Sequence, residues 1–354
     1  LLKLDILGHD VPSIIRHLQD MTGLDPINDV PLKDDKVNSI FAGTEALNIK
    51  DPEYRFIHGS YGIPEFGTKF TRQMLDDTHP TRFADFVRIS GFSHGTDVWI
   101  NNAQDFIRSG EATIKDAIST RDDIMNYLIL KGLPKKKAIT IMEKVRKGKG
   151  VTEEDAELMA ENDVPEWYIE SCRKIAYLFP KAHAVAYVMM AFRIAWFKVH
   201  EPLAFYAAYF YRRSQKGGFD AAMMTHGIDL VKQKLQEIDE AEDATAKDDD
   251  LFTTLEVCYE FYLRGFSFAP IDLYRSHATR FVIEDGKLLP PFVSVSGLGE
   301  TAAWDIMDGR EGKTFLSIEE FSLACPKVSK THIENLKAAG AFGDLPETSQ
   351  ITLF

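Results

Sequence analysis

The chain has 354 residues, of which 45% are hydrophobic and 27% charged, with a formal net charge of −13. This length and apolar content allow two or three packed domains and exclude a disordered chain. Three cysteines stand far apart, in an odd number and without metal-ligand spacing. They argue against a disulfide framework or structural zinc and favour a reducing cytoplasm.

The charge is unevenly distributed along the sequence. Residues 121–150 carry nine Lys or Arg against three acids, and residues 171–200 carry five Lys or Arg and no acid. Residues 237–250 carry eight acids and one Lys, and we interpret them as a flexible link or a solvated helix face. The net charge alone argues against a nucleic-acid partner, but a locally basic cleft can bind phosphates in an acidic protein.

The first residues, "LLKLDIL", predict a buried strand. Asp5 lies within this strand, and a carboxylate there is costly unless it is paired or binds a metal. A structural carboxylate and a metal ligand both remain open at this point. Because the sequence begins without an initiator Met or a charged leader, we expect it to be the C-terminal portion of a longer protein.

Helices are predicted for most of the next two hundred residues. The first is amphipathic and begins at Asp10. The apolar run at 184–197 is interrupted by Arg193 and is shorter than the roughly 20 residues that a bilayer span needs, so it predicts a buried helix and no membrane. Further helices are predicted at 69–76, 82–90, 114–131, 135–147, 152–161, 166–178, 182–200 and 202–213.

The C-terminal part of the sequence has a different pattern. Residues 264–292 alternate like strands and turns, and "EDG" at 284–286 indicates a β-hairpin. A small module of short helices is predicted after them, and no internal repeat of fixed period is found. The predicted fold class is mainly α with minor β.

Two polar stretches are candidates for ligand binding. "SGFSHGTDVW" contains Ser93 and His94 on a turn that can present donors to a phosphate or a base, or that only caps the next helix. In "FPKAHAVAYVMMAFRIAWFK", helical spacing puts Lys181, His183, Tyr187 and Arg193 near one stripe, where Tyr and His can also be ordinary core residues. Because no acid lies nearby in the sequence, we favour an anionic ligand for these two cations.

Two glycine-containing turns are candidates for phosphate contacts. "KVRKGKG" is a basic turn that can cradle phosphates or simply be exposed to solvent. "SGLGE" precedes an amphipathic helix and predicts a helix-hairpin-helix element, whose backbone N–H groups approach a DNA phosphate without reading bases. The residues concerned are Arg146, Lys147, Lys149, Gly297, Leu298 and Gly299.

The sequence ends "QITLF", with Leu353 and Phe354 followed by nothing that could bury them. The short segment before them cannot form its own core. This tail is therefore either frayed or fitted to a pocket on another protein.

Taken in chain order, these stretches resemble PolC-type DNA polymerase III alpha subunits, the replicative C-family DNA polymerases of Gram-positive bacteria. The resemblance covers essentially the whole sequence and departs from the family at "VSGLGETAAW", where Pro more often precedes the glycine, and in the acidic segment. The motifs that carry it are "KLDILGHD", "GIPEFGT", "SGFSHGTDVW", "RDDIM", "VRKGKG", "VPEWYIESC", "FPKAHAVAY", "GFSFAPIDLYRS", "GLG" and "QITLF".

The resemblance implies a domain order. Residues 1–10 would end the palm, 11–215 would form the helical fingers, 216–345 the helix-hairpin-helix domain that binds duplex DNA, and 346–354 a tail that binds the sliding clamp. It also implies template-directed DNA synthesis, in which dNTPs are added to a primer 3′ end during bacterial chromosome replication. The expected partners are primer-template DNA, dNTPs, the beta sliding clamp and other replisome proteins, at the replication fork in the cytoplasm.

The resemblance also assigns roles to residues. Asp5 would be a catalytic palm carboxylate that binds a Mg²⁺ pair together with two upstream aspartates, so the chain alone should be inactive. A non-catalytic scaffold that binds DNA and the clamp is the alternative function. The expected nucleotide-binding residues are Ser93, His94, Arg146, Lys147, Lys181, His183, Tyr187 and Arg193. The expected DNA contacts are Lys149, Gly297, Leu298 and Gly299, and the expected clamp contacts are Gln350, Leu353 and Phe354.

Overall fold

The computed structural model describes residues 10–49, 56–215, 217–241 and 245–349. Within these ranges helices dominate and the one sheet has two strands, which confirms the predicted class of mainly α with minor β. The predicted first strand lies outside the described residues. The chain divides into two compact units. We call them the central unit (Pro31–Ala46 and Tyr54–Ala195) and the flanking unit (Leu1–Val30, Leu47–Glu53 and Trp196–Phe354).

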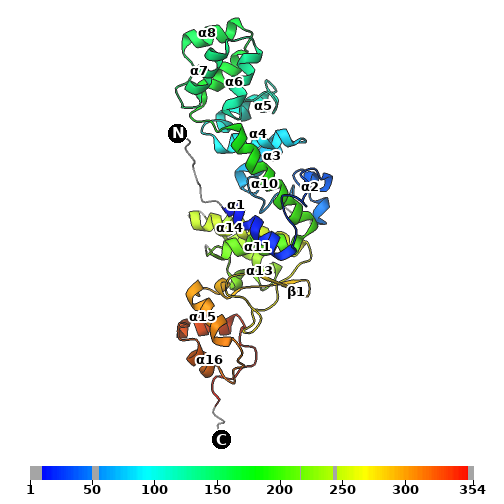
Figure 1. Ribbon diagram of the computed structural model, residues 1–354, viewed down its shortest axis with the longest axis vertical. Helices are drawn as coiled ribbons and strands as arrows, with labels where there is room; N and C mark the ends of the chain where they lie inside the picture. The colour runs from blue at the N-terminus through cyan, green and yellow to red at the C-terminus, as the bar shows by residue number, and fades with distance from the viewer. Residues whose placement is uncertain (1–9, 50–55, 216, 242–244, 350–354) are drawn as a thin grey trace. The chain divides into compact units, whose positions relative to one another are not determined.

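The central unit is helical (Figure 1), and aromatic side chains form its core. Rings of Phe41, Phe66, Phe86 and Phe192 pack with centroids 4.8–5.5 Å apart, in contacts that stabilise the core beyond the area they bury. Its elements are α2 (Asp35–Ser39), α3 (Lys69–Thr78), α4 (Phe83–His94), η2 (Trp99–Ala103), α5 (Gln104–Ser109), α6 (Arg121–Leu130), α7 (Lys135–Val145), α8 (Glu153–Glu161), α9 (Glu166–Lys174) and the first part of α10 (Lys181–His200). A short 3-10 helix, η1 (Glu45–Leu47), lies where the chain passes between the units.

Two predicted helices are shorter than the sequence pattern suggested. The helix predicted at 114–131 begins at Arg121, because Asp123 accepts the backbone N–H of Thr120 at 2.9 Å and closes the first turn there. The helix predicted at 166–178 ends at Lys174, because the residues after it pair with another part of the chain. Local periodicity continued past both ends, and hydrogen bonds decided where the helices stop.

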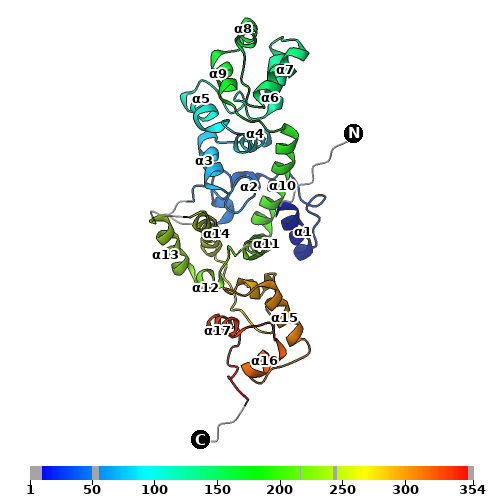
Figure 2. The same cartoon turned by 90° about the vertical axis from the view of Figure 1, so that its left-hand side faces the viewer.

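The flanking unit contains a β-hairpin among helices. Strands β1 (Val282–Glu284) and β2 (Lys287–Leu289) pair antiparallel around Asp285 and Gly286, whose φ values of 49° and 74° suit a two-residue hairpin turn, as predicted from "EDG". The helices are α1 (Asp10–Thr22), the end of α10, α11 (Pro202–Gln215), α12 (Ala221–Met224), α13 (Ile228–Asp239), α14 (Ala246–Leu263), α15 (Glu300–Arg310), α16 (Ile318–Ala324) and α17 (Lys330–Ala338), with a 3-10 turn η3 (Phe292–Ser294). Figure 2 shows α15, α16 and α17 grouped in the small C-terminal module that the sequence predicts.

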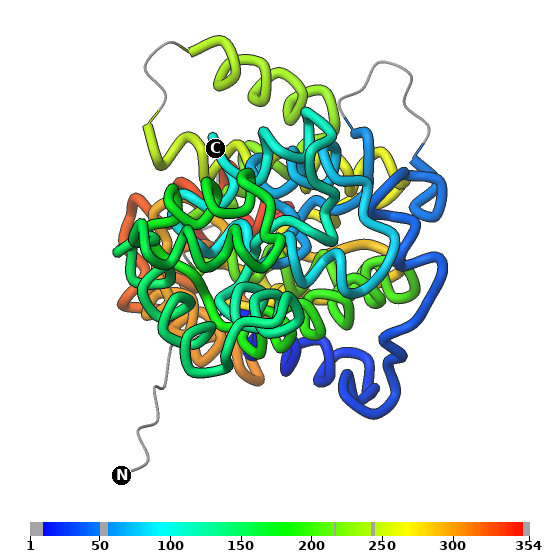
Figure 3. The backbone as a smooth tube through the Cα atoms, turned by 90° about the horizontal axis from the view of Figure 1, so that it is seen from above, coloured from blue at the N-terminus to red at the C-terminus, as the bar shows by residue number. Residues whose placement is uncertain are grey.

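The acidic segment is divided between two helices of this unit. The trace in Figure 3 can be followed along α13 and α14, which pack against each other. α13 ends at Asp239, and α14 begins with Thr245 as its N-cap, whose hydroxyl accepts the N–H of Asp248. Acidic residues in this first turn favour the positive end of the helix. Of the two predicted alternatives, a flexible link and a solvated helix face, residues 246–250 therefore form the solvated helix face.

A buried ion pair joins three helices of the flanking unit. The Nζ of Lys198 on α10 lies 2.7 Å from Glu260 Oε1 on α14, and both side chains are 0% exposed. Tyr206 on α11 donates to the same carboxylate at 2.6 Å. Arg264 donates to the Lys198 carbonyl at 2.9 Å. Each buried charge thus has a partner, as burial of a charge requires.

By length and composition, α10 is the one helix of the described ranges that could cross a membrane. Core helices of soluble proteins pass the same test. Val188, Ala191, Phe192, Ala195 and Phe197 are buried by other parts of the protein, each at 2% exposure or less. The helix is therefore a core helix, in agreement with the sequence prediction.

Candidate functional site

In the central unit, the segment at 176–179 brings together stretches that are distant in the sequence. Thr96 donates its N–H to the Tyr177 carbonyl at 3.0 Å, which ties the turn after α4 to this segment. Leu178 donates to the Arg146 carbonyl at 3.4 Å, which ties the turn after α7 to it as well. The segment then leads into α10. The two polar stretches and the basic turn singled out in the sequence thus meet at one place.

Four rings form a half-buried cluster beside this segment, which we call the ring cluster (His94, Phe179, His183 and Tyr187). The centroids of His183 and Tyr187 lie 4.4 Å apart on successive turns of α10, as their i, i+4 spacing predicted. His94 comes from α4, with its centroid 5.3 Å from Phe179 and 6.2 Å from His183. Aromatic and imidazole faces of this kind can stack on a planar ligand.

The orientation of His94 is set by one hydrogen bond and by a nearby carboxylate. Its Nδ1 lies 2.7 Å from the Ser90 carbonyl, so Nδ1 carries a hydrogen and donates it. Its Nε2 lies 3.4 Å from Oε2 of Glu65, which also accepts the Ser90 hydroxyl at 3.0 Å. The Ser93 hydroxyl donates to the same Ser90 carbonyl at 3.0 Å. Sequence reasoning missed Glu65, which lies 29 positions before His94 and whose φ of +70° is unusual for a non-glycine residue.

The expectation that Lys181 has no acid to pair with is wrong. Its Nζ lies 3.3 Å from Asp123 Oδ1, and its backbone N–H donates to Asp122 at 2.7 Å. Burial raises the pKa of Asp123, but Arg88, the Ser119 hydroxyl and Lys181 outweigh it and hold this pKa below its ordinary value. The partner acids lie on α6, where no local sequence signal connects them to α10. The Lys181 side chain is nevertheless 43% exposed and open to a ligand.

Arg193 differs from Lys181 in its contacts. Within the part of the chain that the structure describes, no acid pairs with it, and its Nε is buried without a hydrogen-bond partner. An unsatisfied buried donor is costly, and a bound anion would remove that cost. For this residue the sequence expectation of an unpaired cation holds among the described residues.

The basic turn after α7 is held together by one acid that the sequence analysis did not select. Glu143 accepts from Arg146 Nε at 2.6 Å and pairs with Lys147 Nζ at 3.2 Å. The hydrogen bond from Arg146 lowers the pKa of Glu143 to about 2. Gly148 has φ +71°, and a Cβ there would lie 2.6 Å from the Ala176 carbonyl oxygen, so only glycine fits. Lys149 follows, exposed to solvent.

In the flanking unit, the predicted hairpin turn has open backbone N–H groups at the start of α15. Gly297 has φ +77°, Leu298 is buried at 3% exposure, and Gly299 is the N-cap of α15 without a side-chain cap. No atom lies within 4 Å of a Cβ built on Gly299. The turn lines an open pocket of about 370 Å³ together with Lys247, the single Lys of the acidic segment, which sequence reasoning also missed.

A second turn, thirty residues later, is closed by the same type of backbone hydrogen bond. Leu298 donates to the Val295 carbonyl at 3.0 Å, and Val328 donates to the Cys325 carbonyl at 3.0 Å. Each turn also bonds to a side chain from the helix that follows the other turn. Asn335 on α17 donates its Nδ2–H to the Ser296 carbonyl at 2.8 Å. Asp305 on α15, thirty residues before Asn335, accepts the Lys327 N–H through Oδ2 at 2.7 Å. We call the two turns the α15 hairpin (295–300) and the α17 hairpin (325–330).

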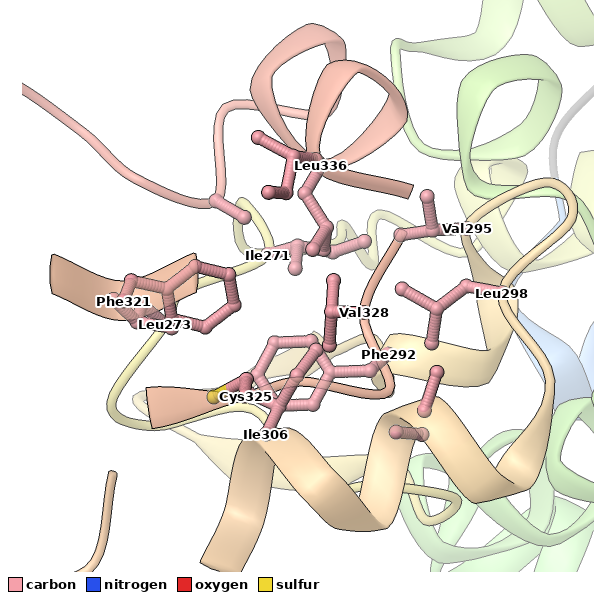
Figure 4. Close-up of a cluster of buried hydrophobic side chains, with 14 of the residues drawn as sticks. Ile271, Leu273, Phe292, Val295, Leu298, Ile306, Phe321, Cys325, Val328 and Leu336 are labelled. Carbon is pink, nitrogen blue, oxygen red and sulfur yellow. The ribbon is translucent and has the colours of Figure 1, made fainter. Parts of the chain in front are cut away.

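Both hairpins bury their apolar residues in one core, shown in Figure 4. Val295, Leu298 and Ile306 are matched, thirty residues later, by Cys325, Val328 and Leu336, and all six are buried. The sequence showed no repeat because these pairs share burial rather than identity.

Four predicted site residues lie outside the described residues: Asp5, Gln350, Leu353 and Phe354. Among the residues that are described, no group of three His, Cys, Asp or Glu side chains could hold a metal ion.

Two stretches of the chain match two family descriptions. Residues 11–163 match the finger domain of the bacterial DNA polymerase III alpha subunit, and residues 265–351 match a helix-hairpin-helix motif. These matches define the class of protein as a bacterial DNA polymerase III alpha subunit.

Relatives identify the particular family. The chain is 53% identical over 355 residues to the PolC-type DNA polymerase III of Clostridium perfringens (strain 13 / Type A), covering 100% of this chain and 24% of the relative. It is 54% identical over 355 residues to that of Caldanaerobacter subterraneus subsp. tengcongensis, covering 100% and 25%. For Thermotoga maritima the identity is 51% over 356 residues, covering 100% and 26%. The chain belongs to the PolC-type DNA polymerase III family and spans about a quarter of the length of these relatives.

Proposed function

We propose that this chain supplies the nucleotide-contacting fingers and the duplex-binding region of a DNA polymerase that carries out template-directed DNA synthesis in bacterial chromosome replication. The observation that carries the proposal is the meeting of the ring cluster, Lys181 and the basic turn around residues 176–179. Identity above 50% to PolC-type relatives over the whole chain supports it. In domain terms, we retain residues 11–215 as the fingers and 216–345 as the duplex-binding domain.

Within the fingers, we assign the charged residues to the triphosphate of the incoming dNTP. Phosphoryl transfer builds negative charge on the phosphates, which positioned cations stabilise. Arg193 has an unsatisfied buried donor, and Lys181 is half exposed. Arg146 and Lys147 share one acid, so at least one positive charge on that turn is uncompensated.

We assign the ring cluster to the base of the nucleotide. His94, His183 and Tyr187 offer ring faces on which a base can stack. Ser93 supports His94 through their shared Ser90 carbonyl.

Catalysis in this proposal needs groups beyond the described residues. Asp5, with two upstream carboxylates, would hold the Mg²⁺ pair, which would supply Lewis-acid activation of the primer hydroxyl and of the leaving phosphates. The chain alone is then expected to lack polymerase activity. Primer extension by the isolated chain in the presence of Mg²⁺ would contradict this assignment.

For the remaining partners, we propose that the α15 hairpin and Lys149 bind the phosphate backbone of the primer-template duplex. Gln350, Leu353 and Phe354 would dock in the groove of the beta sliding clamp, with the last two residues as buried anchors. Tethering to the clamp raises the effective concentration of the enzyme on DNA, so a modest peptide affinity suffices for processivity. The cytoplasmic replication fork is the corresponding location.

The proposal is tested by Arg193→Ala in the full-length polymerase that contains this chain. Loss of a cation that contacts the triphosphate should raise the apparent KM for dNTPs or lower kcat, measured by steady-state primer extension. Arg108→Ala is a matched control, because Arg108 lies in the same unit but is paired with Asp77 on the surface. Unchanged kinetics for Arg193→Ala would remove this residue from the nucleotide site.

A second measurement tests the tail. Binding of the chain to a bacterial sliding clamp is compared with and without residues 350–354, using surface plasmon resonance. Saturable binding that the deletion abolishes supports the clamp assignment. Equal binding, or none by either form at concentrations up to about 100 μM, equivalent to about −5.5 kcal/mol, contradicts it.

A further inference from the structure

The central unit contains a turn with the same architecture as the α15 hairpin. Between α6 and α7, Gly132 has φ +100° and is followed by Leu133, which is buried at 3% exposure. In the α15 hairpin, Gly297 has φ +77° and is followed by Leu298, also buried at 3% exposure. We call the turn between α6 and α7, with its flanking residues 130–137, the basic hairpin.

The helices that follow the two turns also correspond. Ala138 on α7 donates to the Pro134 carbonyl at 3.0 Å, and Ala303 on α15 donates to the Gly299 carbonyl at 3.0 Å. Both alanines are 0% exposed, and Ile141 and Ile306, three residues later in each helix, are 0% exposed as well. The two turns differ in the element that precedes the glycine. A full helix, α6, precedes Gly132, whereas a single 3-10 turn, η3, precedes Gly297.

The charges on the two turns are opposite. α15 begins with Glu300, whereas α7 begins with three lysines, Lys135 to Lys137. Of these, Lys137 pairs with Glu154 at 3.1 Å. Lys135 and Lys136 are exposed, and no acid among the described residues pairs with either. The basic hairpin therefore presents two uncompensated cations.

These cations are placed where a helix disfavours them. The positive end of the helix dipole lies at the start of α7, and cations there are destabilising. The N-cap, Pro134, supplies no side-chain acceptor, and the first turn contains no acid. The Lys131 ammonium is held beside the turn by the Asp163 carbonyl at 2.7 Å. Uncapped N–H groups and lysines together favour an anion that is shared between them.

Apolar side chains flank the same surface. Leu130, directly before the turn, is 85% exposed, and Ile139, one turn into α7, is 44% exposed. A surface that combines cations with exposed apolar side chains suits a ligand with both phosphates and apolar faces, as a DNA strand has.

We infer that the basic hairpin is a further DNA-binding site, in which Lys135, Lys136 and the N–H groups at the start of α7 contact phosphodiester groups of a DNA strand. This site consists of other residues than the nucleotide site and the α15 hairpin. The inference rests on the proposed function only in taking DNA as the ligand. Contact through backbone phosphates makes binding independent of base sequence.

The test is the double variant Lys135→Ala/Lys136→Ala in the full chain. Binding is measured by fluorescence anisotropy over a salt series, with a blunt labelled DNA duplex and with the same duplex carrying a single-stranded extension. Loss of two phosphate contacts should weaken binding on the order of tenfold at low salt. The slope of log K against log salt should fall by about 1.8 if the contacts are to duplex, or by about 1.4 if they are to the extension. A loss on both substrates assigns the hairpin to duplex, and a loss on the extended substrate alone assigns it to the unpaired strand.

A matched control is Lys33→Ala/Lys36→Ala, which removes two exposed lysines from the same unit beside and within α2. This control should change the affinity and the salt slope much less. If both double variants give the same affinity and slope, the inference is overturned. Thermal unfolding of Lys135→Ala/Lys136→Ala should be unchanged or shifted to higher temperature, because repulsion with the helix dipole is removed.

A third variant separates this inference from the proposed function. Gly297→Val forces a side chain into a left-handed conformation in the α15 hairpin and should weaken duplex binding by itself. If Gly297→Val weakens binding while the lysine variant equals its control, only the basic hairpin is excluded. If the unmodified chain binds neither DNA substrate, both the inference and the proposed duplex contact fail.

Discussion

Two lysines on the same helix, α10, show how burial separates a structural charge from one that is available to a ligand. Lys198 is 0% exposed and lies 2.7 Å from Glu260, which is also 0% exposed. Lys181 is 43% exposed and lies 3.3 Å from Asp123. Both are paired with an acid from a distant part of the sequence, so the presence of an ion pair does not distinguish them.

The difference is energetic. A fully desolvated pair cannot lose one partner without leaving a buried charge, at a cost of about 3–5 kcal/mol, and no anion can reach it to compete. A half-exposed pair contributes about 0–1 kcal/mol, so an incoming phosphate can displace the acid at little cost. The buried pair is therefore expected to govern stability, and the half-exposed pair ligand binding.

The largest expected effect is on the buried pair. Glu260→Ala would leave Lys198 buried without a counter-charge, and the free energy of unfolding should fall by about 3–5 kcal/mol in urea denaturation. Glu237→Ala is the control, because Glu237 pairs with Lys234 on an exposed helix face, and it should cost less than about 1 kcal/mol. Similar losses in the two variants would contradict the comparison.

A buried histidine, His17, should make the stability of the flanking unit sensitive to acid. Burial, and then the nearby Arg280, lower the pKa of His17 to about 4. An unfolded His takes up its proton near pH 6.5, so the stabilisation is complete above that pH and is lost as pH falls toward 4. The loss approaches about 3 kcal/mol.

The measurement for His17 compares urea unfolding at pH 7 and at pH 4.5 with that of His17→Phe. Phe keeps a ring against Tyr211, on which His17 stacks at 4.6 Å, but cannot titrate. We expect the unmodified chain to lose about 2–3 kcal/mol more than the variant over this range. Identical pH dependence in the two proteins would show that His17 protonates normally in the folded state. His277, whose pKa burial also lowers, is present in both and cancels.

The half-exposed pair of Lys181 and Asp123 should affect ligand binding rather than stability. Lys181→Ala should change the free energy of unfolding by less than about 1 kcal/mol, but it should raise the dNTP KM of the full-length polymerase about tenfold, or about 1.4 kcal/mol. Lys174→Ala is a matched control, since Lys174 is 36% exposed and pairs with Glu170 at 2.9 Å. A large stability loss with an unchanged KM would make Lys181 a structural residue like Lys198.

The smallest effect on stability is expected for Gly299→Ala. Its φ of −78° suits any residue, and no atom lies within 4 Å of the added Cβ, so the free energy of unfolding should change by less than about 0.5 kcal/mol. The methyl group would nevertheless project from the start of α15 and weaken duplex binding in fluorescence anisotropy. Unchanged affinity would place the DNA phosphate away from this N–H group.

The sequence by itself determined the fold class, most helices, the "EDG" hairpin and the family. These features depend on local chemistry, namely helical spacing, N-caps and turn residues, or on motifs that can be compared directly. It also selected His94, His183 and Tyr187, which the structure brings into one ring cluster.

Only the tertiary structure decided which charges face each other. Asp123 lies 58 positions from Lys181, and Glu260 lies 62 positions from Lys198, so neither pairing has a local signal. The same holds for the α15 and α17 hairpins, whose matched positions share burial rather than residue identity. Periodicity reports which side of an element is apolar, whereas the partner of a buried or half-buried charge is chosen by how distant segments pack.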